Sequence, residues 1–577
     1  MDPAQPKAAQ PQPASQKAGG APAGAAATEE FRKVMERNTH LQHYIAELTQ
    51  RGFPTPRFKL QLSKSVLDEG KPNIIYPVTE PIFVHLYKDD DKGRIIYCPI
   101  EPIIPIKSVS LLKAAEEAIA FRITKNFEFK TQQEHITKLK EILQKCSIVN
   151  PKLKDLGQYE YDDRKRIIAV NEETLKGLEY TLVKEKVGYG VIDPLIRDPY
   201  LEDISCDGKG FIFVEHKIFQ SCDTTLNFDS VENLDEYSMR LSERIGRPAN
   251  FRRPIIDGTL PDGSRINIVY GTDLSLKGTN FTIRKFTAIP ISITQICASN
   301  TMNFMEAAYL WLLLEHNMNM WICGETASGK TTTVKAVLTF VKPTAKIVTI
   351  EDTPELQVPH DNWIREMTRQ GEDAASSIDI FDLLKAALRQ RPNYIVVGEI
   401  RGKEGLIAFQ AMQTGHGVMA TFHASSVIKL VQRLTGYPIE VPKTYVDLLN
   451  AVVFQNLVRI PKTGKTERRV TSINEIIGFD PTEQSYNFIE LFAWDPITDT
   501  HEFRGMGSSY VLEEKIAPLK GITRKRIKDI YLEVDNRAEI LRLMAQKKVF
   551  DYYDVWGYMN KINSMGTENM LKMLRQG

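Results

Sequence analysis

Residues 324–331 read Gly324-Glu325-Thr326-Ala327-Ser328-Gly329-Lys330-Thr331 and follow the apolar run Met320-Trp321-Ile322-Cys323. They fit the pattern G-x-x-x-x-G-K-[ST], in which backbone N–H groups turn inward around a phosphate. Glycine at both ends of the loop permits the backbone angles that this turn requires. Lys330 would place a positive charge on the β- and γ-phosphates of ATP, and Thr331 would offer a hydroxyl to Mg²⁺. The predicted nucleotide-binding residues are Gly324, Glu325, Thr326, Ala327, Ser328, Gly329, Lys330, Thr331 and Thr332.

Helix and strand patterns alternate from residue 301 onward. A helix is expected over 303–316, a strand over 320–323 and a helix over 332–341. Further strands are expected over 346–350, 394–397 and 418–422, with helices over 381–389 and 403–414. Such alternation favours an α/β fold, a parallel sheet with helices on both faces. Its ligand site would lie at the carboxyl ends of the strands. β-rich segments near 451–460, 470–479 and 487–495 precede a helical end.

Acidic side chains follow two of these expected strands. Glu399 ends the apolar run Ile395-Val396-Val397-Gly398, where a carboxylate can bind the Mg²⁺ shell and polarise the attacking water. Glu351, Asp352 and Glu355 follow the strand at 346–350. One of these three is a candidate general base, because a carboxylate near Mg²⁺ can deprotonate water, and at least one is structural.

Two histidines flank the strand at 418–422. His416 precedes that strand and His423 follows it. Both are expected near the edge that carries the phosphate loop, where a neutral imidazole could sense the γ-phosphate through a hydrogen bond. The alternative for each is a structural histidine with its hydrogen bonds satisfied.

Composition limits the classes of function. The 577 residues include 74 Lys and Arg against 73 Asp and Glu, so there is no strong nucleic-acid signal of the kind that a basic excess gives. None of the six cysteines forms a C-x-x-C pair, which favours reduced, buried thiols in a cytosolic protein. No uninterrupted apolar run reaches 18 residues, so work at a membrane is expected from its surface.

The chain before residue 301 divides into four expected parts. Residues 1–28 consist almost entirely of Ala, Pro, Gln, Gly, Ser and Lys, which predicts a disordered tail. Residues 29–150 are expected to form an α+β domain with a helix over 29–50 and two amphipathic helices over 108–146. Residues 165–286 are expected to form a second α+β unit, and 287–300 a linker.

Four boxes in this order resemble the type II/type IV secretion ATPase superfamily. Residues 324–331 match its Walker A box, 351–355 its Asp box, 398–401 its Walker B box ending in Glu, and 414–423 its His box. Residues 261–265 and 282–285 match stretches of the family's N-terminal domain. The forms G-E-T-A-S-G-K-T and E-D-T-P are similar to archaeal members, the motor ATPases of archaella and type IV pili.

The resemblance implies a RecA-like P-loop NTPase domain over 301–577. It also implies a PAS-like domain over 165–286 and a further N-terminal α+β extension that contacts partners. It implies a hexameric, cytoplasmic ATPase at the inner face of the cell membrane, whose two domains open and close across 287–300. Arg265 and Arg284 would then reach the nucleotide from the N-terminal domain, or else be ordinary ion-paired strand residues. Arg401 and Arg389 are weaker candidates of the same kind.

The partners that the resemblance implies are further copies of the chain, a polytopic membrane platform protein and accessory cytoplasmic motor proteins. Pilin or archaellin subunits would be indirect partners, and a membrane surface is a further one. Three functions stay open at this point. The first is an ATPase that assembles an archaellum or a type IV pilus, and the second is a secretion or DNA-transfer motor. The third is a nucleotide-gated binding module with negligible turnover.

Overall fold

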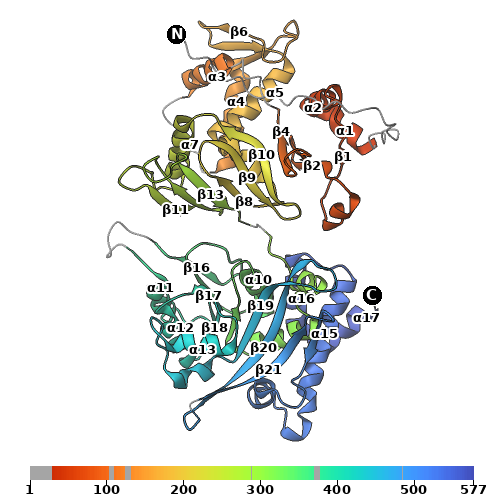
Figure 1. Ribbon diagram of the computed structural model, residues 1–577, viewed down its shortest axis with the longest axis vertical. Coiled ribbons are helices and arrows are strands. Elements are labelled where there is room, and N and C mark those ends of the chain that lie inside the picture. The colour runs from red at the N-terminus through yellow and green to blue at the C-terminus, as the bar shows by residue number, and fades with distance from the viewer. Residues whose placement is uncertain are drawn as a thin grey trace. The chain divides into compact units, whose positions relative to one another are not determined.

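The computed structural model in Figure 1 describes residues 29–102, 109–123, 131–286, 289–369, 377–483 and 485–576. The chain separates into two compact units, residues 1–285 and 286–577. The predicted disordered tail, residues 1–28, lies outside the described residues. Within the described part of the chain, no helix is both long enough and apolar enough to cross a bilayer.

The second unit is built on a nine-stranded sheet with the order β16-β15-β17-β18-β14-β19-β20-β21-β22. The six strands from β16 to β19 are parallel, and β19 to β22 are antiparallel neighbours. The strands are β14 (Met320–Cys323), β15 (Ile347–Glu351), β16 (Trp363–Met367), β17 (Tyr394–Ile400), β18 (Gly417–Phe422), β19 (Ala451–Arg459), β20 (Thr466–Asp480), β21 (Ser485–Asp495) and β22 (Thr500–Phe503).

Both faces of this sheet are covered, as the apolar strands predict. Along β14, Met320 and Ile322 enter one core, and Trp321 and Cys323 enter the other. Figure 1 shows α11 to α13 on one side of the sheet and α15 to α17 on the other. The helices are α8 (Ile293–Ala298), α9 (Phe304–Glu315), α10 (Lys330–Val337), α11 (Ile380–Ala387), α12 (Glu404–Gln413), α13 (Val427–Thr435), α14 (Ala517–Leu519), α15 (Lys528–Gln546), α16 (Tyr552–Met565) and α17 (Thr567–Gln576).

The first unit holds a ten-stranded sheet with the order β1-β2-β3-β4-β10-β9-β8-β13-β12-β11. Helix α7 (Val231–Arg244) contributes Leu234, Tyr237 and Leu241 to its core. The strands are β1 (Arg57–Phe58), β2 (Asn73–Thr79), β3 (Ile82–Lys88), β4 (Ile95–Ile100), β8 (Leu201–Cys206), β9 (Gly210–His216), β10 (Gln220–Phe228), β11 (Ile255–Thr259), β12 (Arg265–Val269) and β13 (Asn280–Arg284).

A separate core in the first unit surrounds a three-stranded sheet. Two further helices near the start of the chain pack on β2 to β4 through Phe31 and Leu41. The elements of this part are α3 (Val109–Arg122), α4 (Gln132–Cys146), β5 (Ser147–Val149), β6 (Tyr159–Asp162), β7 (Ile167–Val170) and α5 (Glu172–Lys186). Helix α6 (Asp193–Arg197) belongs to the core of the ten-stranded sheet through Leu195. The two at the start are α1 (Glu29–Arg37) and α2 (Thr39–Gln50).

Three features differ from the sequence-based expectations. The helix expected over 29–50 is two helices, because Asn38 leaves the helical conformation between α1 and α2. Strand β4 pairs with β10, so one sheet joins strands from the two α+β units expected separately. The expected linker at 287–300 contains α8, whose buried Ile293 and Ile296 belong to the core of the second unit.

Candidate active site

The phosphate loop connects β14 to α10 at the carboxyl edge of the parallel strands, as the sequence predicts. Gly329 has φ 92°, in the left-handed region that glycine adopts readily, and Ala327 has φ 62°. Gly324 is required for another reason. A Cβ at this position would lie 2.0 Å from the carbonyl oxygen of Gln455, so only glycine fits beside β19.

Lys330 begins α10, and its side chain folds back over the loop. Its ammonium donates to the carbonyl oxygens of Gly324 at 3.0 Å and Glu325 at 2.8 Å. Burial lowers the pKa of Lys330, and the nearby Glu399 carboxylate opposes that shift. The ammonium group thus lies at the loop, where an anionic ligand can recruit it.

The loop also holds a polar atom without a partner. Ser328 is fully buried, and its Oγ makes no hydrogen bond to any described residue. A buried hydroxyl without a partner is costly, and a bound ligand or ion is one explanation for it. The loop residues therefore fit a triphosphate, with Ser328, Lys330 and the N-terminus of α10 facing the same space.

Glu399, near the end of β17, meets His423 and Arg401. The His423 Nε2 lies 2.6 Å from Glu399 Oε1, and Arg401 Nε donates to Glu399 Oε2 at 2.8 Å. β17 and β18 are parallel neighbours, which brings the residues after their carboxyl ends together. Burial and the charge of Lys330 lower the pKa of His423. A lowered pKa favours the neutral form of this imidazole.

Glu351, at the end of β15, is the most buried acid of the Asp box. Its Oε1 accepts from the backbone N–H groups of Glu355 at 2.9 Å and Leu356 at 2.7 Å. Its Oε2 makes no hydrogen bond to a described residue, and Arg365 Nε lies 3.8 Å away. Burial raises the pKa of Glu351 to about 7. A carboxyl with that pKa can take up a proton at neutral pH.

The other two acids of this segment lie around Glu351. Glu355 is half-buried, and its charge acts on both Glu351 and Lys335. Asp352 is exposed, accepts a hydrogen bond from Thr368 at 3.1 Å, and lies 3.9 Å from Arg401. Of the three acids, Glu351 is thus the one most shielded from solvent.

His416 lies at the opposite edge of the sheet, so the expectation of two histidines at one edge is wrong. Gly417, the next residue, pairs with Tyr394 at the amino ends of β18 and β17. At about 3.3 Å per residue, β18 separates His416 from His423 by about 20 Å. His416 contacts Thr414 Oγ1 at 3.0 Å. It takes no part in the constellation around Lys330.

Arg265 and Arg284 stand side by side on β12 and β13 of the first unit. Asp257 binds Arg265 at 2.8 Å, and Asp203 binds Arg284 at 3.2 Å. These carboxylates offset the repulsion between like charges on paired strands. Both arginine side chains remain largely exposed, 44% and 66%. Their role toward a nucleotide stays a prediction.

Sequence reasoning missed three side chains of the second unit that touch this site. Gln455 of β19 and Arg468 of β20 bind carbonyl groups of the phosphate loop. Arg433 of α13 donates to the His423 carbonyl oxygen and lies over the Phe422 ring. The signal for Gln455 was a polar residue directly after the apolar run 451–454, within an expected strand. Nothing local distinguished Arg433 or Arg468 from surface arginines.

Comparison with known proteins identifies the family. Residues 185–487 match the family model described as type II/IV secretion system protein. The chain is 43% identical over 549 residues to the uncharacterized protein MJ0900 of Methanocaldococcus jannaschii, covering 92% of this chain and 97% of that relative. The chain belongs to the type II/IV secretion system protein family. This confirms the family that the four boxes indicated.

Two more distant likenesses were found. The conjugal transfer protein TrbB of Rhizobium radiobacter is 30% identical over 236 residues, which is 40% of this chain and 70% of TrbB. The ATPase DotB of Legionella pneumophila is 19% identical, with 58% of this chain and 93% of DotB covered. The TM-score for DotB is 0.36. Together, the family and the complete phosphate loop make this secretion ATPase-family member an enzyme that hydrolyses ATP.

Proposed function

We propose that the protein is a hexameric motor ATPase that powers assembly of an archaellum or a type IV pilus-like filament through a membrane platform protein. The observation that carries the proposal is the convergence of Glu351, Glu399 and His423 with the phosphate loop at one sheet edge. Archaeal motif forms and the long similarity to a Methanocaldococcus protein support the filament system of an archaeon. The proposal includes rotation of the filament as a second possible output besides its assembly.

Each residue of the constellation has a role in the proposed hydrolysis. Loop N–H groups and Lys330 bind the β- and γ-phosphates of ATP and neutralise charge that develops during transfer. Glu351, with its raised pKa, accepts a proton from the attacking water. Glu399 orients that water, and His423 holds the Glu399 carboxylate in place. Release of Glu399 from Arg401 would accompany nucleotide binding.

Mg²⁺ fits the side chains of this edge. Among the described residues, no three acidic, histidine or cysteine side chains gather as a preformed metal cage. Magnesium in nucleotide sites usually takes one or two protein oxygens, with phosphates and waters completing its shell. Thr331, which is half-buried and follows Lys330, and Glu399 are the residues that would hold it. The ion would supply charge stabilisation on the phosphate oxygens.

The first unit completes the proposal. Residues 165–286 would act as the PAS-like N-terminal domain, and residues 301–577 as the RecA-like domain. Arg265 and Arg284 would approach the γ-phosphate within or across subunits, exchanging their aspartate partners for the nucleotide. Hydrolysis would then alter the relation of the two domains and push on the platform protein.

Replacement of Glu399 by Gln tests the site. The amide keeps the shape but removes the charge, so steady-state ATP turnover should fall by about 100-fold or more while ATP binding persists. The readouts are phosphate release and the Kd of a fluorescent ATP analogue. Unchanged turnover would show that the catalytic carboxylate lies elsewhere. If, in addition, wild-type ATP turnover is negligible, the result would favour a nucleotide-gated binding module.

The similarity to the conjugal transfer protein TrbB favours one alternative, a secretion or DNA-transfer motor. ATPase assays with single-stranded DNA, and separately with anionic liposomes, distinguish the two proposals. If DNA stimulates ATP hydrolysis, and DNA binding depends steeply on salt concentration, the nucleic-acid motor would be supported in place of the filament motor. Stimulation by liposomes alone would support work at a membrane.

A further inference from the structure

A second set of contacts holds the phosphate loop from the side of the β19–β20 hairpin. Gln455 Nε2 donates to the carbonyl oxygen of Ser328 at 2.9 Å, and Gln455 Oε1 accepts from Thr333 Oγ1 at 2.7 Å. Arg468 Nε donates to the carbonyl oxygen of Ala327 at 3.0 Å. Two consecutive loop carbonyls are thus held by side chains of one hairpin.

The hairpin is shaped to make these contacts. The pairing of β19 with β20 shifts register between Phe454 and Gln455, and such a bulge redirects the side chain that follows it. A Cβ on Gly329 would lie 2.9 Å from Gln455 Nε2 and 3.0 Å from Arg468 Cδ. Gln455 and Arg468 therefore pack directly on the outer surface of the loop, with no space for an intervening side chain.

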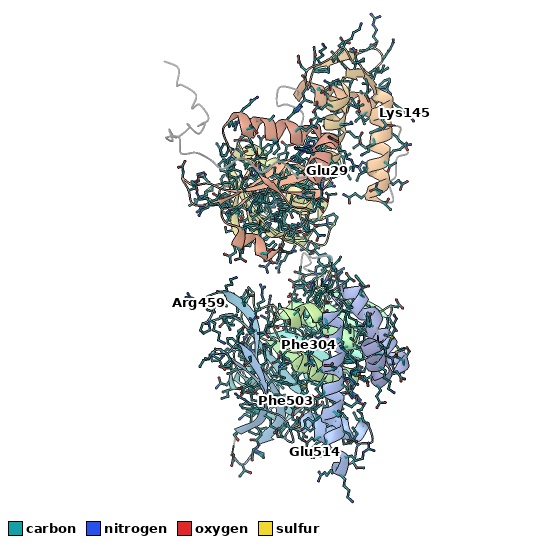
Figure 2. The ribbon with its side chains drawn as sticks, turned by 90° about the vertical axis from the view of Figure 1, so that its right-hand side faces the viewer. Glu29, Lys145, Phe304, Arg459, Phe503 and Glu514 are labelled. Carbon is teal, nitrogen blue, oxygen red and sulfur yellow. The ribbon has the colours of Figure 1, made fainter. Side chains whose placement is uncertain are left out.

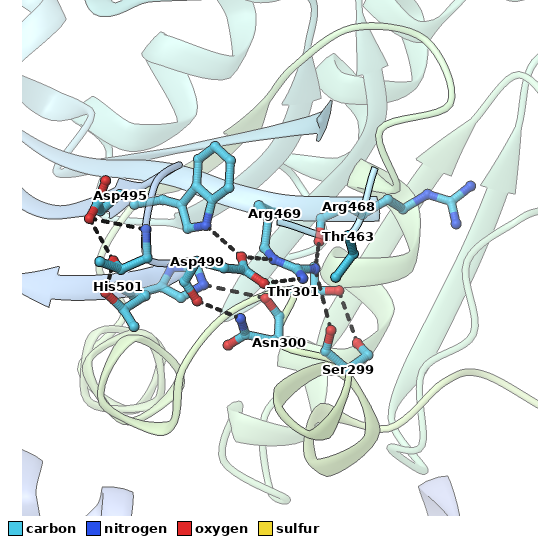
Figure 3. A network of polar contacts seen from close by, with 12 residues as sticks. Ser299, Asn300, Thr301, Thr463, Arg468, Arg469, Asp495, Asp499 and His501 are labelled. Atoms are coloured by element: carbon cyan, nitrogen blue, oxygen red, sulfur yellow. Dashed lines mark hydrogen bonds and ion pairs between the residues drawn. The ribbon is translucent and has the colours of Figure 1, made fainter. Parts of the chain in front are cut away.

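The hairpin itself is anchored on its other side. Figure 3 shows Arg469, the neighbour of Arg468, directed toward Asp499 and the turn at 299–301. Arg469 is buried and binds both Asp499 oxygens, at 2.8 and 2.9 Å. The Val470 N–H donates to the Thr301 carbonyl oxygen at 2.6 Å. β20 is therefore a fixed support from which Arg468 reaches the loop.

We propose that Gln455 and Arg468 are positioning residues for ATP hydrolysis, which aim the loop N–H groups at the phosphates. The reason is the geometry of the peptide group, in which the C=O and the following N–H point in opposite directions. Holding the Ala327 carbonyl outward turns the Ser328 N–H inward, where it donates to the Glu325 carbonyl oxygen at 3.4 Å, an acceptor that a phosphate would replace. Holding the Ser328 carbonyl outward does the same for the Gly329 N–H. Neither side chain needs to touch the nucleotide.

Paired substitutions at Arg468 test the proposal on the full-length protein. Arg468→Lys and Arg468→Met both keep an aliphatic stem against Gly329, but only lysine keeps an N–H donor for the Ala327 carbonyl. Arg468→Met should raise the KM for ATP and the Kd for ADP about three- to ten-fold, with a smaller change in kcat. Arg468→Lys should restore most of the affinity.

The matched control is Arg459→Met on the same hairpin. Figure 2 shows Arg459 at the end of β19, where its backbone pairs with Thr466 and its side chain makes no hydrogen bond or ion pair to a described residue. Its KM and kcat should stay within two-fold of wild type. Equal behaviour of Arg468→Met and Arg468→Lys would overturn the proposal. So would a lower thermal unfolding temperature of Arg468→Met with an unchanged KM.

A second position guards against a purely structural explanation. Gln455→Glu keeps an acceptor for Thr333 Oγ1 and replaces the donor that faces the Ser328 carbonyl. Its KM for ATP should therefore rise more than that of Arg468→Met, and an unchanged KM would contradict the assigned role.

Because Gln455 and Arg468 act on the proposed nucleotide site, the inference rests on the proposed function, and Lys330→Ala is assayed in parallel. If Lys330→Ala binds nucleotide as well as wild type, the proposed nucleotide site is wrong. If Lys330→Ala loses nucleotide binding but the Arg468 and Gln455 variants behave like wild type, only the positioning role of Arg468 and Gln455 is wrong.

Discussion

The two edges of the parallel sheet in the second unit treat their polar groups differently. At the amino ends of the central strands, Asn319 donates to the Leu448 carbonyl and accepts from the Val418 N–H, both at 2.8 Å. At the carboxyl ends, Ser328 Oγ and Glu351 Oε2 are buried without hydrogen-bond partners in the described structure. Each such group costs about 1–3 kcal/mol. One edge stabilises the sheet, and the other keeps polar atoms available for a ligand.

The largest expected effect compares one lysine from each edge. Lys330→Ala removes the positive charge of the phosphate loop, and ATP turnover should fall by about 10²–10³-fold, as for loss of a charge-stabilising donor elsewhere. Tight nucleotide binding should be lost as well. Phosphate release and equilibrium binding of a fluorescent ATP analogue measure the two effects.

Lys346→Ala is the control at the amino edge, where Lys346 donates to the Gln390 carbonyl at 2.7 Å. Turnover of this variant should remain within two-fold of wild type, with a small loss of stability. Equal loss of turnover in both variants would remove the functional difference between the edges.

Glu351→Gln should separate stability from activity. Burial raises the pKa of Glu351 to about 7 from an ordinary 4.5, so the folded protein favours the protonated form. That stabilisation is present below about pH 4.5 and is lost as pH rises through 7. The loss amounts to at most about 3 kcal/mol. Glutamine cannot ionise, so the variant should gain stability relative to wild type between pH 5 and pH 8 in urea unfolding.

The same variant should lose turnover at every pH if Glu351 is the general base. A stability difference that does not change between pH 5 and pH 8 would show that Glu351 titrates normally. Retained turnover would move the role of base to Glu355 or Asp352.

The stability contributed by the Arg469–Asp499 ion pair of Figure 3 should depend on pH in a different range. Hydrogen bonds from Arg469 lower the pKa of Asp499 to about 2. This carboxylate therefore contributes stability that is present above about pH 4 and is lost as pH falls through 2. The contribution is about 2 kcal/mol. Asp499→Asn should lower the free energy of unfolding at pH 6 by that amount and leave it unchanged near pH 2.

Sequence patterns predicted the part of this fold that depends on local periodicity. The strands at 320–323, 347–351 and 417–422 and the loop between β14 and α10 lie where the alternation of apolar segments placed them. Glu351, Glu399 and His423 could be assigned to one edge because residues that end parallel strands share that edge. These inferences needed only the direction of each strand.

Inferences that depend on which strands pair with each other, or on which end of a strand a residue lies, could not be made from local sequence patterns. His416 was placed wrongly because a residue that precedes a strand lies at the opposite edge from one that follows it. The pairing of β4 with β10 joins residues about 125 positions apart, and no local pattern encodes such a contact. Gln455 acquires its contact with the loop from a register shift between β19 and β20.

The two histidines give the smallest effect and the most direct comparison of the edges. His423 Nε2 lies 2.6 Å from Glu399, so His423→Ala should lower kcat about ten-fold by freeing that carboxylate. His416→Ala should leave kcat unchanged, because the His416 ring contacts Thr414 at the other end of β18. Burial and Lys330 lower the pKa of His423, which favours the neutral imidazole at pH 8. His423→Gln, which places a neutral polar side chain beside Glu399, should therefore recover part of the lost kcat. Equal kcat values for His423→Ala and His416→Ala would mean that closeness to Glu399 does not distinguish the two edges.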